Sequence, residues 1–272
     1  MTTDMLVEGR HFLPGADPRA LGHKALAVNL SDLAACGARP RWMTLALALP
    51  SADEHWLKNF SAGLFALADR HDVELVGGDT TRGPLTIDIT AFGEVPAGKA
   101  LSRAGARPGD DLWVSGELGG AALALAHPEI AAAAKRLHQP EPRVALGERL
   151  RGLARAAIDV SDGLAGDLGH ILERSGVGAV VHYERIPRDA SFGKLQDPSL
   201  EAQCILSGGD DYELLFAAGR DRRGAIEAVS RELGISLSLI GELNSEKEKL
   251  TVLDGSGKPM SYRGGYDHFA QS

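Results

Sequence analysis

The sequence has 272 residues, 44% of them hydrophobic and 24% charged, which are ordinary values for a globular protein with one large or two medium-sized domains. The formal net charge is −8 and aromatic residues make up 5% of the chain, so it has neither the basic stripe nor the stacking residues of a nucleic-acid-binding protein. It contains no N-terminal signal pattern and no apolar run of about 18 residues, so we expect a cytoplasmic protein without a membrane segment.

The first part of the chain alternates between helix and strand patterns. The opening "TTDML" is typical of the polar end of a strand rather than of a frayed terminus. A helix is expected to end at Gly37, and another to begin at Ser51, with Glu54 at the capping-box spacing. The elements expected after the opening strand are a helix over 20–36, a strand over 41–50, a helix over about 51–71, and strands over 73–78 and 86–95.

Residues 96–111 are rich in glycine, proline and charge, and predict a connection between two units. The stretch that follows has the same alternating character as the first, which predicts α/β layers in both. Its expected elements are strands over 111–116, 156–160, 178–183, 212–218 and 236–243, helices over about 118–135, 142–155, 163–174 and 221–233, a loop over 186–200, and a hairpin with an Asp-Gly turn over 244–259.

Aspartates gather where an α/β protein builds its ligand sites, because several follow predicted strands. For any one of them alone, a helix cap or a turn is the more common explanation, as for Asp162 and Asp79. Asp32 is harder to explain in this way, since it lies within an apolar helix where an unpaired acid is costly. The aspartates in question are Asp4, Asp32, Asp79, Asp159, Asp162 and Asp210.

Taken together, these acids favour a site for a hard cation. Thr3 and Ser161 add further oxygen atoms, and all-oxygen ligand sets suit Mg²⁺, which in turn bridges phosphates. The glycine pairs in "VGGDTTRG" and "LSGGDDYE" would let backbone amides approach a phosphate, although a tight turn also explains such pairs. Arg82 and Arg103 are candidate phosphate contacts, although a solvated surface position explains each of them at least as well.

A series of stretches along the chain resembles the thiamine-monophosphate kinase family, part of the aminoimidazole-ribonucleotide-synthetase-like superfamily of ATP-using enzymes. The resemblance runs in order from residue 2 to about residue 269. "NLSDLAA" and "VGGDTT" occur more widely in the superfamily, whereas "HF" after "TD" and the closing "GGYDHF" are specific to the kinase family. The matching stretches are "TTDMLVEGRHF", "KALAVNLSDLAACGARP", "ELVGGDTTRG", "LSRAGARPGD", "AAIDVSDGLAGDL", "LSGGDDYELLF" and "GGYDHF".

This resemblance implies two α/β domains, 1–97 and 98–272, with ATP in the cleft between them and a homodimer formed through the first domains. It implies a direct in-line phosphoryl transfer from ATP to thiamine monophosphate that depends on Mg²⁺ and forms no phosphoenzyme. Such catalysis consists of positioning and charge neutralisation, which agrees with a set of metal-holding carboxylates. The implied partners are the two substrates and a second copy of the chain, with no nucleic acid and no membrane.

Matched position by position, the resemblance gives each candidate residue a role. The implied Mg²⁺ ligands are Thr3, Asp4, Asp32, Asp79, Asp159 and Asp162. The implied nucleotide contacts are Gly78, Asp79, Arg103 and Ser161, and the implied catalytic residues are Asp79, Arg103 and Asp162. The side that binds thiamine monophosphate is expected to include His11, Asp210 and, as an aromatic wall, Tyr266.

Two departures from the family pattern modify these expectations. Asp210 stands where the family often has glutamate, which should shift that contact without abolishing it. Family members also carry a segment before the stretch around Thr3, with a helix, a strand and a Gly-Asp-Asp motif, so we expect the first sheet to lack a strand and the metal cluster to lack some ligands. Two alternatives stay open: another ATP-dependent enzyme of the superfamily, or a nucleotide-binding protein with impaired catalysis.

Overall fold

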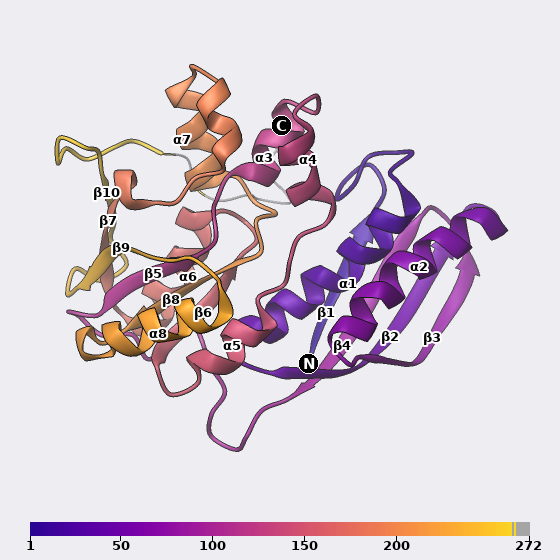
Figure 1. The fold of residues 1–272 in the computed structure, drawn as a ribbon, viewed down its shortest axis with the longest axis horizontal. Helices are drawn as coiled ribbons and strands as arrows, with labels where there is room; N and C mark the ends of the chain where they lie inside the picture. Colours follow the sequence, from indigo (N-terminus) through magenta and orange to yellow (C-terminus); the bar gives the residue numbers. More distant parts are fainter. Residues whose placement is uncertain (263, 265–272) are drawn as a thin grey trace.

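The computed structural model describes residues 1–262 and 264, and places them in two α/β units that each contain one sheet (Figure 1). The first sheet has the strand order β1-β4-β2-β3, in which β2 and β3 are parallel and the other pairs are antiparallel. Its strands are β1 (Thr2–Val7), β2 (Arg39–Leu49), β3 (Glu74–Arg82) and β4 (Thr86–Glu94).

The second sheet has the order β10-β7-β9-β5-β8-β6. Its strands are β5 (Asp111–Ser115), β6 (Ala154–Val160), β7 (Gly178–His182), β8 (Glu213–Ala218), β9 (Leu237–Asn244) and β10 (Leu250–Leu253). The expected hairpin over 244–259 is only partly correct, because β10 pairs in parallel with β7. The Asp-Gly turn does form, and a bridge between Leu253 and Pro259 closes it.

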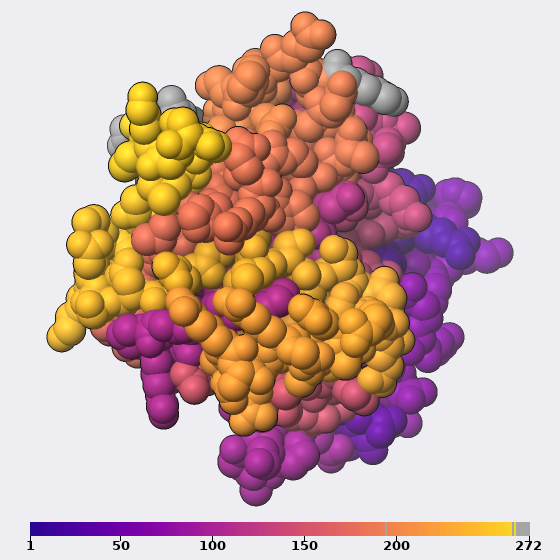
Figure 2. Space-filling view, turned by 60° about the vertical axis from the view of Figure 1, so that its left-hand side comes forward, coloured from indigo at the N-terminus to yellow at the C-terminus, as the bar shows by residue number. Residues whose placement is uncertain are grey.

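The helices surround these sheets. In the first unit, α1 (Pro18–Ala35) and α2 (Glu54–Arg70) cover one face of the four-stranded sheet. Figure 2 shows a face of the molecule formed mostly by the second unit. The helices of that unit are α3 (Gly120–Ala126), α4 (Ala131–His138), α5 (Val144–Leu150), α6 (Leu164–Ser175), α7 (Pro198–Ser207) and α8 (Arg223–Leu233), with short 3-10 turns η1 (Tyr183–Arg185), η2 (Ala190–Lys194) and η3 (Arg220–Arg222).

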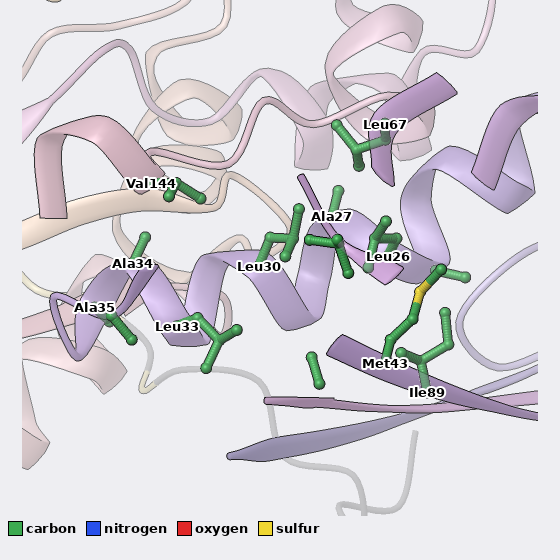
Figure 3. Packing of buried hydrophobic residues seen from close by; sticks show 14 of the residues in the cluster. Leu26, Ala27, Leu30, Leu33, Ala34, Ala35, Met43, Leu67, Ile89 and Val144 are labelled. Carbon is green, nitrogen blue, oxygen red and sulfur yellow. The ribbon is translucent and has the colours of Figure 1, made fainter. Parts of the chain in front are cut away.

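Helix α1 is the central element, because it packs against both units at once. It is buried on nearly all sides, as expected for a helix whose sequence is apolar all round. Figure 3 shows Leu26 on the side of Met43 and Ile89 from the four-stranded sheet, whereas Ala34 lies near Val144 of α5. Buried polar side chains of α1, such as Lys24 and Ser31, therefore reach residues of the second unit at the junction.

Helices α1 and α2 approach each other closely through two glycines. A Cβ on Gly22 would lie 2.1 Å from the carbonyl oxygen of Phe60, and one on Gly63 would lie 1.8 Å from that of Arg19. Alanine at either position would therefore push the helices apart. This contact fixes α1 against its own unit, so its free face is presented to the second unit.

The α/β fold in two units was expected from the sequence and is confirmed, but several local predictions were wrong. The helix expected over 118–135 is divided into α3 and α4, because Pro128 disfavours helical geometry at the residue before it. Helix α7 was missed altogether, and it begins after Asp197 and Pro198, a strong start signal. Helix α2 is capped by Asp53 rather than Ser51.

The outer face of the four-stranded sheet, opposite α1 and α2, carries Met5, Trp42 and Thr90, among others, and remains uncovered in the described chain. Met5 is 54% exposed and Trp42 is 38% exposed. The boundary at 97/98 stays a proposal; it falls in the segment between β4 and β5. None of the described helices is both long and apolar enough to cross a membrane.

Candidate active site

Strand β1 directs alternate side chains to opposite faces of the first sheet. Asp4 is paired with Ile89 and Thr2 with Ala91, and both of these β4 residues are fully buried. Asp4 and Thr2 therefore face inward, toward α1. The expected strand at the chain's opening is confirmed, and it carries one of the predicted acids directly to the interior side of the sheet.

Two further acids come from the elements packed against β1. Asp32 of α1 accepts a hydrogen bond from the Thr2 hydroxyl. Asp159, near the end of β6 and 4% exposed, accepts a hydrogen bond of 2.6 Å from the Ser31 hydroxyl of α1. The first sheet, α1 and the second sheet thus each contribute one carboxylate to the junction between the units.

The turn after β6 adds Ser161 and Asp162. The side chain of Asp167 holds this turn, because its Oδ2 atom accepts hydrogen bonds of 3.0 Å from the backbone N–H groups of both residues. Burial is the main cause that raises the pKa of Asp167 to about 7. Asp162 does not cap α6, since the residue at the cap position is Gly163, so the simpler explanation for this aspartate does not apply.

These side chains line a cavity of about 370 Å³ between the two units, called here the acidic cavity. Most of its charged lining is negative, with positive groups contributed by α1 and by the loop after β1. The residues used in the argument below are Asp4, His11, Lys24, Asp32, Asp159, Ser161, Asp162, Asp210 and Tyr212. Nearly all the acids predicted from the sequence therefore meet in one place.

A second cavity of about 500 Å³ lies on the other side of Asp32 and Asp159, which line both spaces. Arg103, an exposed residue in the connection between the units, lines this second cavity together with Ser102 and Gly93. We call it the Arg103 cavity. Asp32 and Asp159 are therefore shared by the acidic cavity, which holds His11 and Asp210, and the Arg103 cavity.

Crowding of carboxylates is the main electrostatic feature of the site. Burial, and then the negative charge of Asp32 and other nearby acids, raises the pKa of Asp4 to about 6. Burial followed by the charge of Asp32 also raises the pKa of Asp159 well above its ordinary value. Carboxylates held together in this way are stabilised by a cation, and a set of oxygen donors suits Mg²⁺. Among the described residues, no three histidine, cysteine or acidic side chains converge closely enough to hold an ion by themselves.

The predicted acceptor side is also brought to the acidic cavity. The Nδ1 atom of His11 accepts a hydrogen bond of 3.0 Å from the backbone N–H of Val7. Asp210 lies in the loop before β8, where Lys24 donates to it at 2.9 Å. Tyr266 lies outside the described residues.

Three predicted residues line neither the acidic cavity nor the Arg103 cavity. The Thr3 hydroxyl lies on the outer face, 3.0 Å from that of Thr90. Gly78 and Asp79 lie on β3, an exposed strand at the opposite edge of the sheet from β1. Asp79 aligns with Met5 across three strand spacings, which corresponds to about 14 Å. A Cβ on Gly78 would lie 1.9 Å from the Leu45 carbonyl oxygen, so the close approach of β2 requires glycine there.

Comparison with known proteins identifies the family of this chain. Family models for the N-terminal and C-terminal domains of AIR synthase related proteins match residues 1–95 and 107–253. Thiamine-monophosphate kinase from Salmonella typhimurium is 46% identical over 281 residues, covering 99% of this chain and 86% of that protein. The Escherichia coli K12 enzyme is 45% identical with the same coverage. This chain belongs to the thiamine-monophosphate kinase family. The family and enzyme class expected from the sequence are thereby confirmed.

Solved structures of the kinase family share the fold. Thiamine-monophosphate kinase from Stenotrophomonas maltophilia is 46% identical, with a TM-score of 0.90 over 95% of this chain and 85% of that chain. AaThiL in complex with AMPPCP and TMP is 31% identical, with a TM-score of 0.86 over 98% of this chain and 86% of that chain. A hydrogenase maturation protein, HypE, in complex with ATP shares the fold at 24% identity and a TM-score of 0.76.

Sequence reasoning missed several residues that line the two cavities or support their lining. Thr2 faces Asp32, whereas Thr3 was the threonine predicted as a metal ligand. The side chains of these two adjacent residues point to opposite faces of β1. Asp167 was visible as an acid within an apolar helical stretch, which is the signal that singled out Asp32. Lys24 was visible in the same way, as a cation within the apolar run of α1.

Proposed function

We propose that this chain transfers the γ-phosphoryl group of ATP to thiamine monophosphate, forming thiamine diphosphate and ADP. The observation that carries this proposal is the position of Asp32 and Asp159 between two cavities, one with Arg103 and one with His11 and Asp210. In a direct transfer, an oxygen of the acceptor phosphate attacks the γ-phosphorus while the bond to ADP breaks. A shared wall of carboxylates suits such a reaction, because the donor and acceptor phosphates must meet there.

We infer that Mg²⁺ would be held by the inward-facing acids, with Asp4, Asp32, Asp159 and Asp162 as the ligands supplied by one chain. The crowding of these acids, and the raised pKa values of Asp4 and Asp159, fit a group of carboxylates that is neutralised by a cation. When bound, Mg²⁺ would offset the charge of the phosphates. Thr3 and Asp79 complete the proposed set.

The nucleotide is proposed to bind on the Arg103 side. Arg103 would contact a phosphate, and Ser161, at the turn held by Asp167, would contribute its hydroxyl or backbone N–H. Gly78 and Asp79 are the other proposed nucleotide contacts. With Asp162, the residues Asp79 and Arg103 form the proposed catalytic set, whose task is to orient the phosphates and neutralise their charge.

The acceptor is proposed to bind on the His11 side. Asp210 and His11 both line the acidic cavity, and the related AaThiL has been solved in complex with TMP together with AMPPCP. His11 would hydrogen-bond the acceptor, and Asp210 would contact its cationic part. Tyr266 completes this side of the proposal as an aromatic wall.

We propose a homodimer that covers the outer face of the four-stranded sheet. A sheet face with Met5 and Trp42 exposed is of the kind that a second copy covers. Such a dimer would also explain how Asp79 reaches a metal site. Within one chain, Asp79 lies across the sheet from the acidic cavity, whereas in the dimer it would serve the cavity of the partner copy. The cytoplasmic location expected from the sequence stays a prediction.

The function is tested by coupling ADP formation to an optical readout, with purified protein, ATP, MgCl₂ and thiamine monophosphate. We expect ADP formation that depends on thiamine monophosphate and on Mg²⁺, and chromatography that identifies thiamine diphosphate. ADP formation with another acceptor only would favour a different activity of the superfamily. ATP binding in calorimetry without turnover would favour a nucleotide-binding protein with impaired catalysis.

A further inference from the structure

Lys24 is a buried cation to which the proposed function gives no task. It is 4% exposed and lies in α1 among apolar neighbours such as Leu21 and Ala25. A buried ammonium group is costly unless it is paired. Its Nζ atom lies 2.9 Å from Oδ2 of Asp210, so a helix of the first unit is paired with a loop of the second.

Asp210 itself occupies an unusual backbone position. Its φ angle is +69°, a left-handed conformation that is uncommon for residues other than glycine, and Tyr212 has a φ of +52°. The backbone N–H of Asp210 donates to the Ser161 carbonyl at 2.9 Å, which ties the loop to the turn after β6. Such conformations persist where surrounding contacts fix them.

Both oxygens of the Asp210 carboxylate are held, and by different units. The Tyr212 hydroxyl donates to Oδ1 at 2.9 Å, and Lys24 donates to Oδ2. Lys24 also lines a smaller, largely apolar cavity of about 80 Å³ that adjoins the acidic cavity and includes Phe12 and Leu137. The carboxylate is therefore fixed at the point where the charged and apolar spaces meet.

We propose that Lys24 is a positioning residue for the acceptor substrate. It holds the Asp210 carboxylate against the cavity wall, so that the affinity for thiamine monophosphate depends on Lys24 while the affinity for ATP does not. The inference rests on the proposed function, in which Asp210 contacts the acceptor. Lys24 thereby couples acceptor binding to the packing of α1 between the units.

The test compares steady-state kinetics of Lys24→Met, Lys24→Arg, Asp210→Asn and the double variant Lys24→Met/Asp210→Asn. We expect Lys24→Met to raise the KM for thiamine monophosphate by about tenfold or more, with less than about a twofold change in the KM for ATP. Lys24→Arg should recover most of the loss, because it keeps a charged donor. The double variant should resemble Asp210→Asn, since the two residues act as a unit. Lys58→Met, at an exposed position of α2, is the matched control.

Each other outcome contradicts a defined claim. If the wild-type protein does not phosphorylate thiamine monophosphate, the proposed function and this inference both fail. If it does, and Lys24→Met leaves that KM unchanged or raises the KM for ATP equally, the inference alone is overturned. Should Lys24→Met not fold, the double variant decides, because it leaves neither an unpaired carboxylate nor an unpaired ammonium group, and it must show the same selective rise.

Discussion

The two faces of the four-stranded sheet differ in how far a single chain covers them. On the inner face, Thr2 donates to Asp32 of α1 and lines the Arg103 cavity, and Asp4 lines the acidic cavity, so one chain supplies these contacts. On the outer face, Thr3 and Met5 come from the same strand but remain exposed. Neighbouring residues of one motif therefore serve different surfaces, because strand alternation separates them.

Residues that match one sequence motif therefore need not lie in one local site of a single chain. On the inner side, burial and neighbouring acids raise the pKa values of Asp4 and Asp159, which is why we propose that a cation neutralises this cluster. The outer face instead exposes the large apolar side chains Met5 and Trp42, which is why we propose it as the dimer interface. The expected effects of substitutions on the two faces differ accordingly.

The largest effect is expected at the buried acid of the inner site. Asp159→Asn should lower kcat by about 100-fold or more, because it removes a proposed metal ligand from the wall between the two cavities. At pH 8 its Tm without metal should equal or exceed that of the wild type, since the raised pKa of Asp159 means that its charge opposes folding. The measurements are the coupled assay and thermal unfolding.

Asp69→Asn, at an exposed position of α2, is the matched control and should change neither quantity. An Asp159→Asn protein that retains wild-type turnover would remove this residue from the metal site. A large fall in Tm at pH 8 would instead show that the carboxylate is needed for folding.

The next effect is expected on the outer face. Trp42→Asp should weaken dimerisation by about 100-fold or more in Kd, because a charge would be buried between the two copies. Turnover should fall with the fraction of dimer, as Asp79 would no longer reach a site. Analytical ultracentrifugation and the assay at several protein concentrations measure both. Phe65→Asp, on the exposed side of α2, should leave the dimer intact, and an unchanged Kd for Trp42→Asp would exclude this face as the interface.

The smallest effect compares adjacent threonines of β1. Thr2→Val should lower kcat by about three- to tenfold, since it removes the hydroxyl that donates to Asp32. Thr3→Val should lower kcat by a similar factor in the dimer, because the Thr3 hydroxyl lies beside Thr90 on the outer face and belongs to the proposed metal set through the partner copy. Parallel kinetics of the two variants check this, and a Thr3→Val dimer with wild-type kcat would remove Thr3 from the metal set.

Much of the fold could be predicted because its signals are local. The apolar run of α1 and its end at Gly37 define a buried helix, and the alternation of Ile87 and Ile89 defines a half-buried strand. The division of α3 from α4 and the parallel pairing of β10 with β7 depend on a proline and on a distant partner strand. Periodicity alone does not contain that information.

The acids of the site were predictable as a set because buried carboxylates in apolar surroundings need a common explanation. The residues that contact these acids were harder to predict. Thr2 was missed because a register shift of one residue exchanges the two faces of a strand. The pairing of Lys24 with Asp210 joins residues that are far apart in the sequence, and only the packing of α1 between the units brings them together.

The most direct test of this account uses mixed dimers of two differently tagged variants, Asp79→Asn and Asp159→Asn. Each variant alone should be nearly inactive. If Asp79 serves the site of the partner copy, the mixed dimer contains one intact site and should recover roughly half of the wild-type turnover. Mixed dimers as inactive as their parents would contradict the assignment, because every site would then contain one of the two substitutions.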